Sequence, residues 1–149
     1  MAHVEMTEIV LPEDSNAHGT IFGGRVLALI DKCAAIAAIR HVRGDVLTVA
    51  LDSVEFRNSV RVGNILVLEA RMNAAFRSSM EVEVLVHAED PGSGARTLTT
   101  RAFVTMVAVD REGRPRPVPP LELATDEDRR RAAEAGDRRR ARLAGRTPD

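Results

Sequence analysis

Apolar residues follow two different periods along this chain, and the change of period separates a helical part from a strand-forming part. From Gly24 to about Val42, Ala, Leu and Ile occupy nearly every face of a helical repeat. A helix that is apolar all round is usually buried inside a fold. Residues 79–89 instead alternate: one face carries Met80, Val82, Val84 and Val86, and the other carries Glu81, Glu83 and Leu85. This alternation predicts a strand with two different faces.

Strands are predicted on both sides of the helix. A short one runs from about Val4 to Leu11 and precedes the turn-rich run PEDSNAHG. Four long ones cover residues 46–56, 65–76, 79–89 and 97–110, and the proline-rich run REGRPRPVPPL ends them. This order predicts an α+β fold in which one antiparallel sheet curls around a long central helix. Because one sheet cannot enclose a helix completely, we expect a partner subunit.

The C-terminal segment has a different composition. Residues 1–120 form the predicted domain, and residues 121–149 are an Arg/Ala-rich tail, predicted to be a marginal helix or disordered. Thr125 is the expected N-cap, with acidic residues in the first turn. The segment lacks a wide apolar stripe and contains Gly136. Acids interleave with its arginines and no aromatic side chain is available to stack on bases, so a solvated segment is favoured over an RNA-binding one.

Composition narrows the functional classes. The 149 residues suit one domain, and a formal charge of −1 gives no overall field that attracts nucleic acid or membrane. A single cysteine excludes an internal disulfide and fits a reducing compartment. No apolar run reaches the ~18 residues of a membrane span, and the N-terminus lacks the pattern of a signal peptide. We therefore expect a cytoplasmic protein that binds neither nucleic acid nor membrane.

A carboxylate interrupts the apolar helix at Asp31. Its helical neighbours, including Leu27 and Ala35, cannot pair with it, and Lys32 points in another direction. Burying an unpaired carboxylate is costly. Two interpretations are therefore open: Asp31 is a functional acid, or it meets a basic residue or backbone donors elsewhere in the fold.

The loop before the helix adds further candidates. Gly23 and Gly24 allow close backbone approach, and free N–H groups at a helix start suit an anion or a developing oxyanion. The same pair also suits a simple entry turn. Asn16 can polarise a carbonyl or orient a water, and it can equally form an Asx-turn.

Other reactive residue types favour structural roles. Cys33 follows Asp31 by two positions, so it points away from Asp31, and no histidine lies within one turn of it. A buried cysteine is usually a small apolar filler. His3, His41 and His87 lack the spacing of metal ligands, so no metal site is predicted.

The first block of the sequence resembles a known family. The pattern N-x-x-G-x-I-F-G-G-x-x-L-x-x-I-D, from Asn16 to Asp31, is similar to hotdog-fold acyl-CoA thioesterases of the cytosolic acyl-CoA hydrolase type. DSVEF at 52–56, RSS at 77–79 and AVDREGRPRPVP at 108–119 resemble three further blocks of that family. The likeness runs from about residue 6 to 119, with Ser59 and Asn64 departing from the usual Pro and Asp of one turn.

The resemblance implies a fold, a substrate and a set of site residues. It implies the hotdog fold, a homodimer and commonly a homohexamer, with a site at the dimer interface that takes Asn16 from one subunit and Asp31 from the other. The substrate would be a fatty acyl-CoA, hydrolysed to CoA and a free acid without a metal or another cofactor. The carbonyl oxygen would face the N–H of Gly24 and, less directly, Gly23. Coenzyme A contacts are expected from Arg77, Ser78, Ser79 and Arg114.

Two alternative functions stay open at this stage. A hotdog dehydratase acting on hydroxyacyl thioesters would use His18 with Asp31, although the helix-entry pattern fits a thioesterase better. A non-catalytic acyl-CoA sensor would need an effector segment, and regulators of that kind carry a DNA-binding segment that is not apparent in this sequence. Acyl chain length, nucleotide regulation and the chemical role of Asp31, as general base or as nucleophile, are not readable from the residues.

Overall fold

The structure, a computed structural model, describes residues 3–145 and consists of one sheet between two helices. The strands are β1 (His3–Ile9), β2 (Val46–Phe56), β3 (Ile65–Ala75), β4 (Ser79–Glu89) and β5 (Arg96–Ala108). The helices are α1 (Gly23–Val42) and α2 (Asp126–Ala144), and a single 3₁₀ turn, η1, covers Pro12–Asp14. All neighbouring strands are antiparallel, in the order β1-β3-β4-β5-β2.

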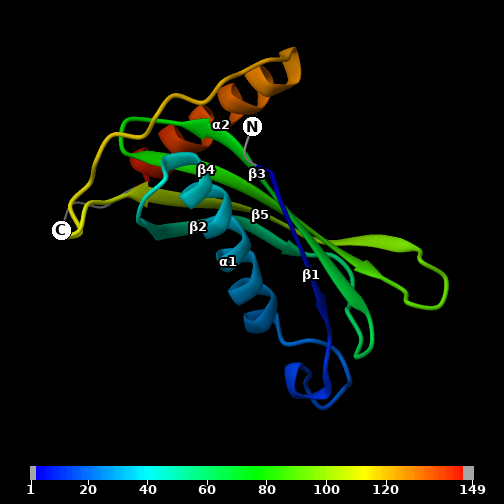
Figure 1. Ribbon diagram of the computed structural model, residues 1–149. Helices are drawn as coiled ribbons and strands as arrows, with labels where there is room; N and C mark the ends of the chain where they lie inside the picture. Colours follow the sequence, from blue (N-terminus) through cyan, green and yellow to red (C-terminus); the bar gives the residue numbers. More distant parts are fainter. Residues whose placement is uncertain (1–2, 146–149) are drawn as a thin grey trace.

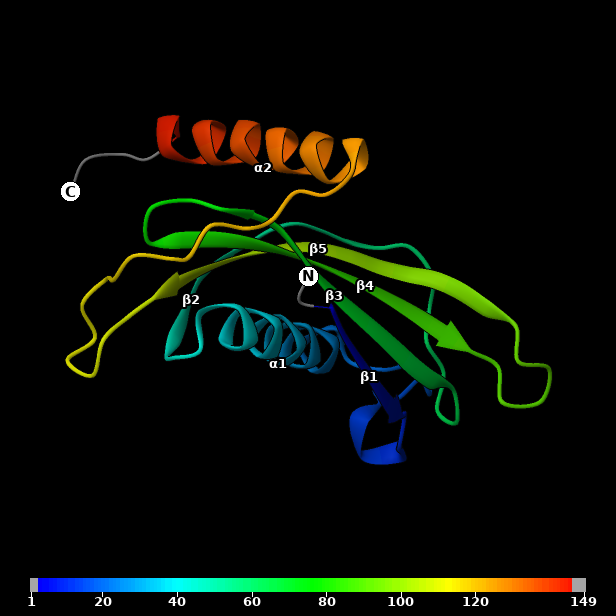
Figure 2. The ribbon, with the colours of Figure 1, turned by 45° about the horizontal axis from the view of Figure 1, so that its top comes forward.

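The two helices cover opposite faces of the sheet. Figure 2 shows α1 beneath the curved sheet and α2 above it, and Figure 1 shows α1 crossing the concave side. The expected α+β architecture, with a long helix wrapped by an antiparallel sheet, is confirmed. The helix and strand boundaries agree with the predicted ones to within about two residues.

The core lies between α1 and the concave face of the sheet. Met80, Val82, Val84 and Val86 of β4 are fully buried there, which confirms the alternation seen in the sequence. The helix meets them with small side chains, including Cys33 and three fully buried alanines at 34, 37 and 38. Small residues let the helix axis approach the sheet closely, which gives a close-packed interior.

One side of α1 is not covered by its own sheet. Ala28 and Lys32 are exposed, and Ile39 is exposed despite its size. The adjacent edge strand β2 also exposes Leu47 and Val49. The composition of the helix predicted burial on every side. That prediction is wrong for a single chain, because one five-stranded sheet reaches around only part of the helix.

The C-terminal segment forms a helix, one of the two forms expected of it. Residues 126–144 form the helix α2, which packs across the convex face of the sheet, chiefly on β3. Thr125 is the N-cap as predicted, and its hydroxyl accepts a hydrogen bond of 3.0 Å from the backbone N–H of Asp128. The last four residues of the predicted tail, 146–149, lie outside the described residues.

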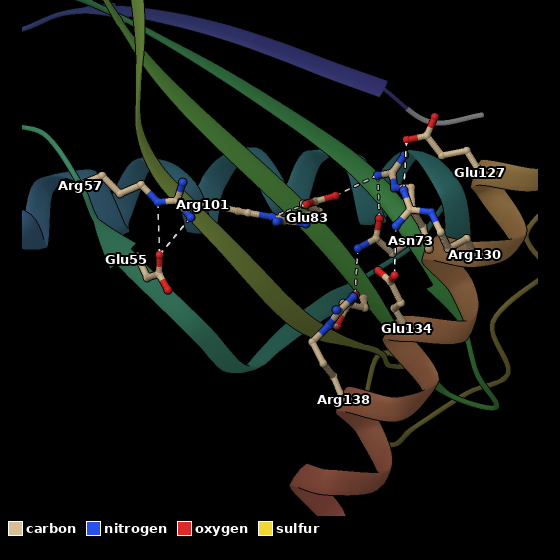
Figure 3. Close-up of polar contacts among 11 residues, drawn as sticks. Glu55, Arg57, Asn73, Glu83, Arg101, Glu127, Arg130, Glu134 and Arg138 are labelled. Carbon is tan, nitrogen blue, oxygen red and sulfur yellow. Dashed lines mark hydrogen bonds and ion pairs between the residues drawn. The ribbon is translucent and has the colours of Figure 1, made fainter.

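Ion pairs rather than apolar contacts hold α2 on the sheet (Figure 3). Arg131, with 7% of its surface exposed, donates to Glu83 at 3.0 Å and to Asn73 at 2.7 Å. Arg138 donates to Glu81 through two nitrogens, at 2.7 and 2.8 Å. A sequence pattern of apolar positions misses such a helix, because the groups that dock it are charged.

The same network extends along the sheet. Asn73 donates to Glu81 at 2.9 Å, and Arg101 of β5 donates to Glu83 at 2.7 Å. The guanidinium of Arg138 also lies 3.8 Å from the centre of the Phe103 ring, a favourable cation–π arrangement. The two buried glutamates of β4 are thus each satisfied by partners on more than one element, which offsets the cost of burying their charge.

No helix within the described part of the chain is both long enough and apolar enough to cross a membrane.

Removing Arg131 tests the ionic docking of α2. Arg131→Ala leaves the buried Glu83 with only the partly exposed Arg101, so we expect it to lower the free energy of unfolding by about 3 kcal/mol. Arg129→Ala, on the same helix, removes an exposed pair with Asp126 and should cost far less. Urea unfolding measures both variants, and equal losses would contradict the assigned role of Arg131.

Candidate active site

Asp31 meets a hydroxyl group from the edge strand. Its side chain is half-buried on the uncovered side of α1, and the Oγ1 of Thr48 on β2 donates to its Oδ1 at 2.5 Å. The partner of Asp31 is therefore neither a basic residue nor a backbone donor, the two structural partners that the sequence suggested. One oxygen of the carboxylate is held in place and the other has no partner among the described residues, an arrangement suited to a positioned acid or base.

Thr48 was not singled out from the sequence. It lies within a predicted strand, and which face of a strand a residue occupies depends on register, which is set by pairing. The usable signal is the presence of a hydroxyl residue in an otherwise apolar run, VLTVAL, shortly after the helix. That signal is weak, because threonine is common in strands for its branched side chain alone.

Two β-bulges in β2 decide which of its residues face α1. The pairing with β5 shifts between Thr48 and Ala50 and again between Asp52 and Glu55, so each time one extra residue is inserted. Thr48, Leu51 and Val54 are three residues apart and would alternate between faces in a regular strand. The bulges bring Thr48 to Asp31 and place Leu51 and Val54 together in the pocket beside it.

A pocket of about 490 Å³ opens beside Asp31 on this side of the helix, and we call it the catalytic pocket. Apart from Asp31 and Gly24 its walls are apolar: Leu27, Ala28, Leu51, Val54 and Phe56. A Cβ atom added to Gly24 would meet nothing within 4 Å, so the helix start borders open space. The pocket combines one positioned carboxylate with room for an apolar ligand.

The start of α1 offers backbone donors to this pocket. Phe22 is the N-cap and provides no side-chain cap, and the first N–H groups of a helix have no partner inside it. The N–H groups of Phe22 and Arg25 bond to the carbonyls of Asp14 and Phe22. Within residues 3–145, Gly23 and Gly24 have no such acceptor, so their N–H groups are available to a ligand.

Asn16 is not brought to Asp31 within one chain. Its Oδ1 accepts hydrogen bonds from the backbone N–H of His18 at 2.9 Å and of Thr20 at 3.3 Å, which is the Asx-turn alternative. Its Nδ2 donates to the Thr20 hydroxyl at 2.9 Å. In the described part of the chain Asn16 shares neither a pocket nor a hydrogen bond with Asp31. His18 is exposed and likewise does not line the catalytic pocket.

The residues expected to contact coenzyme A lie at the opposite end of α1. Arg77 and Ser78 lie in the β3–β4 turn, and Ser79 begins β4. The carbonyl of Arg77 accepts a hydrogen bond from the N–H of Val118. Two residues earlier on that segment, Arg116 donates to the carbonyl of Val42, where α1 ends. Arg114 is exposed in the preceding turn. A single chain therefore separates these residues from Gly24 by the length of the helix.

Cys33 is fully buried, as expected of an apolar filler. Desolvation raises the pKa of its thiol to about 11, although a hydrogen bond with the backbone of Ala70 acts in the opposite direction. The thiol therefore stays protonated near neutral pH and is a poor nucleophile. Among residues 3–145, no group of three or more His, Cys, Asp or Glu side chains is placed to hold a metal ion.

Comparison with known proteins identifies the class of protein. The family model of the thioesterase superfamily matches residues 18–95, more than half of the chain. A crystal structure of an apo hexameric acyl-CoA thioesterase is 46% identical, with a TM-score of 0.89 over 97% of this chain and 95% of that chain. This chain therefore belongs to the thioesterase superfamily, and the predicted resemblance is confirmed.

The curated relatives found by sequence are named as hydrolases of acyl-CoA thioesters. A Bacillus subtilis protein described as an uncharacterized acyl-CoA thioester hydrolase is 39% identical over 84% of this chain and 73% of its own length. The cytosolic acyl coenzyme A thioester hydrolase of Mus musculus is 35% identical over 89% of this chain. This chain spans only about a third of the length of that mammalian relative, since the match covers 35% of it.

A second solved relative supplies matching positions. The acyl-CoA hydrolase of Staphylococcus aureus, solved with butyryl coenzyme A, coenzyme A and coenzyme A disulfide, is 35% identical with a TM-score of 0.88. The alignment covers 96% of this chain and 87% of that chain. Variants of that enzyme carry Ala in place of an Asn, an Asp and a Thr that are separated by 15 and 17 residues. Asn16, Asp31 and Thr48 have the same separations in this chain.

Thiol labelling tests the burial of Cys33. We expect no reaction with a disulfide reagent in the native protein at pH 8 and one thiol per chain after unfolding, because the native thiol is buried and protonated. Cys33→Ala should keep the catalytic activity. Rapid labelling of the folded protein, followed by inactivation, would contradict the structural role.

A glycine at the second bulge tests its backbone strain. Ser53 has a φ of 54°, which disfavours any side chain, so Ser53→Gly should raise the free energy of unfolding by up to about 1 kcal/mol. Ser53→Val should lower it by about 1–2 kcal/mol. Thr97→Gly, in a regular stretch of β5, serves as the control and should destabilise. Thermal unfolding measures the stability of the three variants. A destabilised Ser53→Gly would contradict the backbone strain assigned to Ser53.

Proposed function

We propose that this chain hydrolyses fatty acyl-CoA thioesters to coenzyme A and a free carboxylic acid. The observation that carries the proposal is the Asp31–Thr48 pair in an apolar pocket whose rim holds the free N–H group of Gly24. The names and bound ligands of the relatives support the same substrate class.

The reaction follows from this arrangement. The thioester carbonyl oxygen faces the N–H of Gly24, with Gly23 beside it, and these donors stabilise the negative charge that develops in the transition state. Asp31 either removes a proton from the attacking water or attacks the carbonyl carbon itself to give a mixed anhydride. The carbon–sulfur bond breaks, coenzyme A leaves as its thiol, and water supplies the oxygen of the acid. Thr48 fixes the orientation of the carboxylate, and neither route needs a metal.

The complete site takes residues from two subunits. Asn16 of one chain would hold the carbonyl or the water beside Asp31 of its partner, which accounts for their separation within one chain. The exposed apolar residues Leu47 and Val49 on the edge strand β2 and Ile39 on α1 provide the surface for this dimer. Two solved relatives, the apo acyl-CoA thioesterase described above and a thioesterase from Yersinia pestis, are hexameric, which supports a trimer of such dimers.

The nucleotide end of coenzyme A requires cationic contacts. We assign them to Arg77, Ser78, Ser79 and Arg114, which lie in turns or at the start of β4, with both arginines exposed. In a two-fold dimer with antiparallel helices, the end of one α1 comes beside the start of the other, which brings these turns toward the partner's site. We also propose a cytoplasmic location, in keeping with the cytosolic mammalian relatives.

Activity of three variants tests the chemistry. Asp31→Asn and Asn16→Ala should each lower kcat by at least about 100-fold, because a general base or an oriented carbonyl is lost. Thr48→Ala should lower kcat by about 10-fold, with rescue by Thr48→Ser, since the hydroxyl only orients Asp31. Thiol release from acyl-CoAs of increasing length measures all of them, and the exposed Asp45→Asn is the control.

Mixing the two inactive variants tests the shared site. A dimer of Asn16→Ala with Asp31→Asn contains one intact site and one doubly defective site, so random mixing should restore about a quarter of the wild-type activity. No recovery after verified subunit exchange would contradict the shared site. Full hydrolysis by Asp31→Asn alone would contradict the role of the carboxylate.

A further inference from the structure

Phe56 stands between two cavities. It lines the catalytic pocket, and it also lines a second cavity of about 250 Å³ that we call the side pocket. Among the described residues, Phe56 is the one residue that belongs to both. The side pocket is otherwise lined chiefly by the segment 57–60 and by Ile21 and Val26.

The position of Phe56 depends on the start of α1. Phe56 is the last residue of β2, and its Cα is paired with Thr100 of β5. A Cβ atom added to Gly23 would lie 3.6 Å from the Cζ of the Phe56 ring, so the ring lies against the helix start. Within one chain the Phe56 side chain is 54% exposed. The partition between the two pockets is therefore a single side chain.

The side pocket has an apolar floor and a polar rim. Val26 and Val60 are buried at its base, next to the partly buried Ile21. Arg57, Asn58 and Ser59 are exposed at its rim. Of the parts of an acyl-CoA, only the hydrocarbon chain matches such a floor, because the pantetheine arm and the nucleotide are polar.

We propose that Phe56 determines the acyl-chain length that this protein accepts, by separating the catalytic pocket from the side pocket. With the ring in place, the chain is confined to the catalytic pocket. When the ring is removed, the far end of a longer chain enters the side pocket and covers its apolar floor. This inference rests on the proposed function, since it assumes an acyl-CoA ligand in the catalytic pocket.

Binding of non-hydrolysable S-alkyl-CoA thioethers tests the inference without relying on catalysis. Calorimetric titration would compare butyl, octyl, dodecyl and hexadecyl thioethers on the wild type and on Phe56→Ala. Each methylene that becomes buried should tighten binding about fourfold. We therefore expect at least about a 10-fold gain for the long thioethers and little change for butyl-CoA.

Two further variants make the result specific. Phe22→Ala is a matched control, because Phe22 is also 54% exposed and lies at the helix start but lines neither pocket. It should leave the length profile unchanged. Adding Ser59→Phe to Phe56→Ala refills the side pocket from its rim and should restore the wild-type profile. Unchanged binding of the butyl thioether by Phe56→Ala shows that the single variant is folded.

The outcomes separate this inference from the proposed function. A uniform loss of affinity for every thioether in Phe56→Ala would overturn the inference, since the ring would then be only a contact for a part common to all of them. Hydrolysis by the wild type with an unchanged length profile in Phe56→Ala would overturn it while the proposed function stands. A length-dependent gain in binding without any hydrolysis would support the partition and contradict the proposed hydrolase. Absence of all thioether binding would overturn both.

Discussion

The close packing of one helix on one curved sheet is the constraint on which the rest of this structure depends. Cys33 and the alanines of α1 let the helix pack closely on the curved sheet. Because five strands reach only part of the way round, one side of α1 stays open beside β2. Asp31 lies on that open side. The same packing that forms the core therefore exposes the one carboxylate of the helix to a ligand.

The convex face of the sheet follows a different physical principle. Charged groups meet there in pairs and triplets, so the burial of Glu81 and Glu83 is compensated by arginines of α2 and β5. Buried ion pairs contribute little net stability compared with apolar packing, but they require correct partners. A helix attached in this way has one favoured position, because displacing it leaves charges unpaired. The sheet thus separates an apolar layer, which carries the candidate chemistry, from an ionic layer that holds the C-terminal helix.

Strand β2 links the fold to the candidate chemistry. It is an edge strand, paired on one side only, and its two bulges insert residues that a regular strand would not accommodate. Through them Thr48 reaches Asp31, and Leu51 and Val54 share one wall of the catalytic pocket with Phe56. Edge strands tolerate bulges because only one ladder of hydrogen bonds is disturbed. The irregular strand is consequently the element that shapes the pocket, while the regular strands form the core.

The sequence by itself determined the α+β class, the helix and strand boundaries and the family, since period, turn residues and the Asn16–Asp31 block are local signals. It also indicated Asp31, because a carboxylate in an apolar helix stands out without any knowledge of its partners. Only the tertiary structure decided that Thr48 is that partner, that α2 docks through charges and that Phe56 borders two pockets. Each of these depends on strand register or on contacts between distant segments, and no local pattern encodes them.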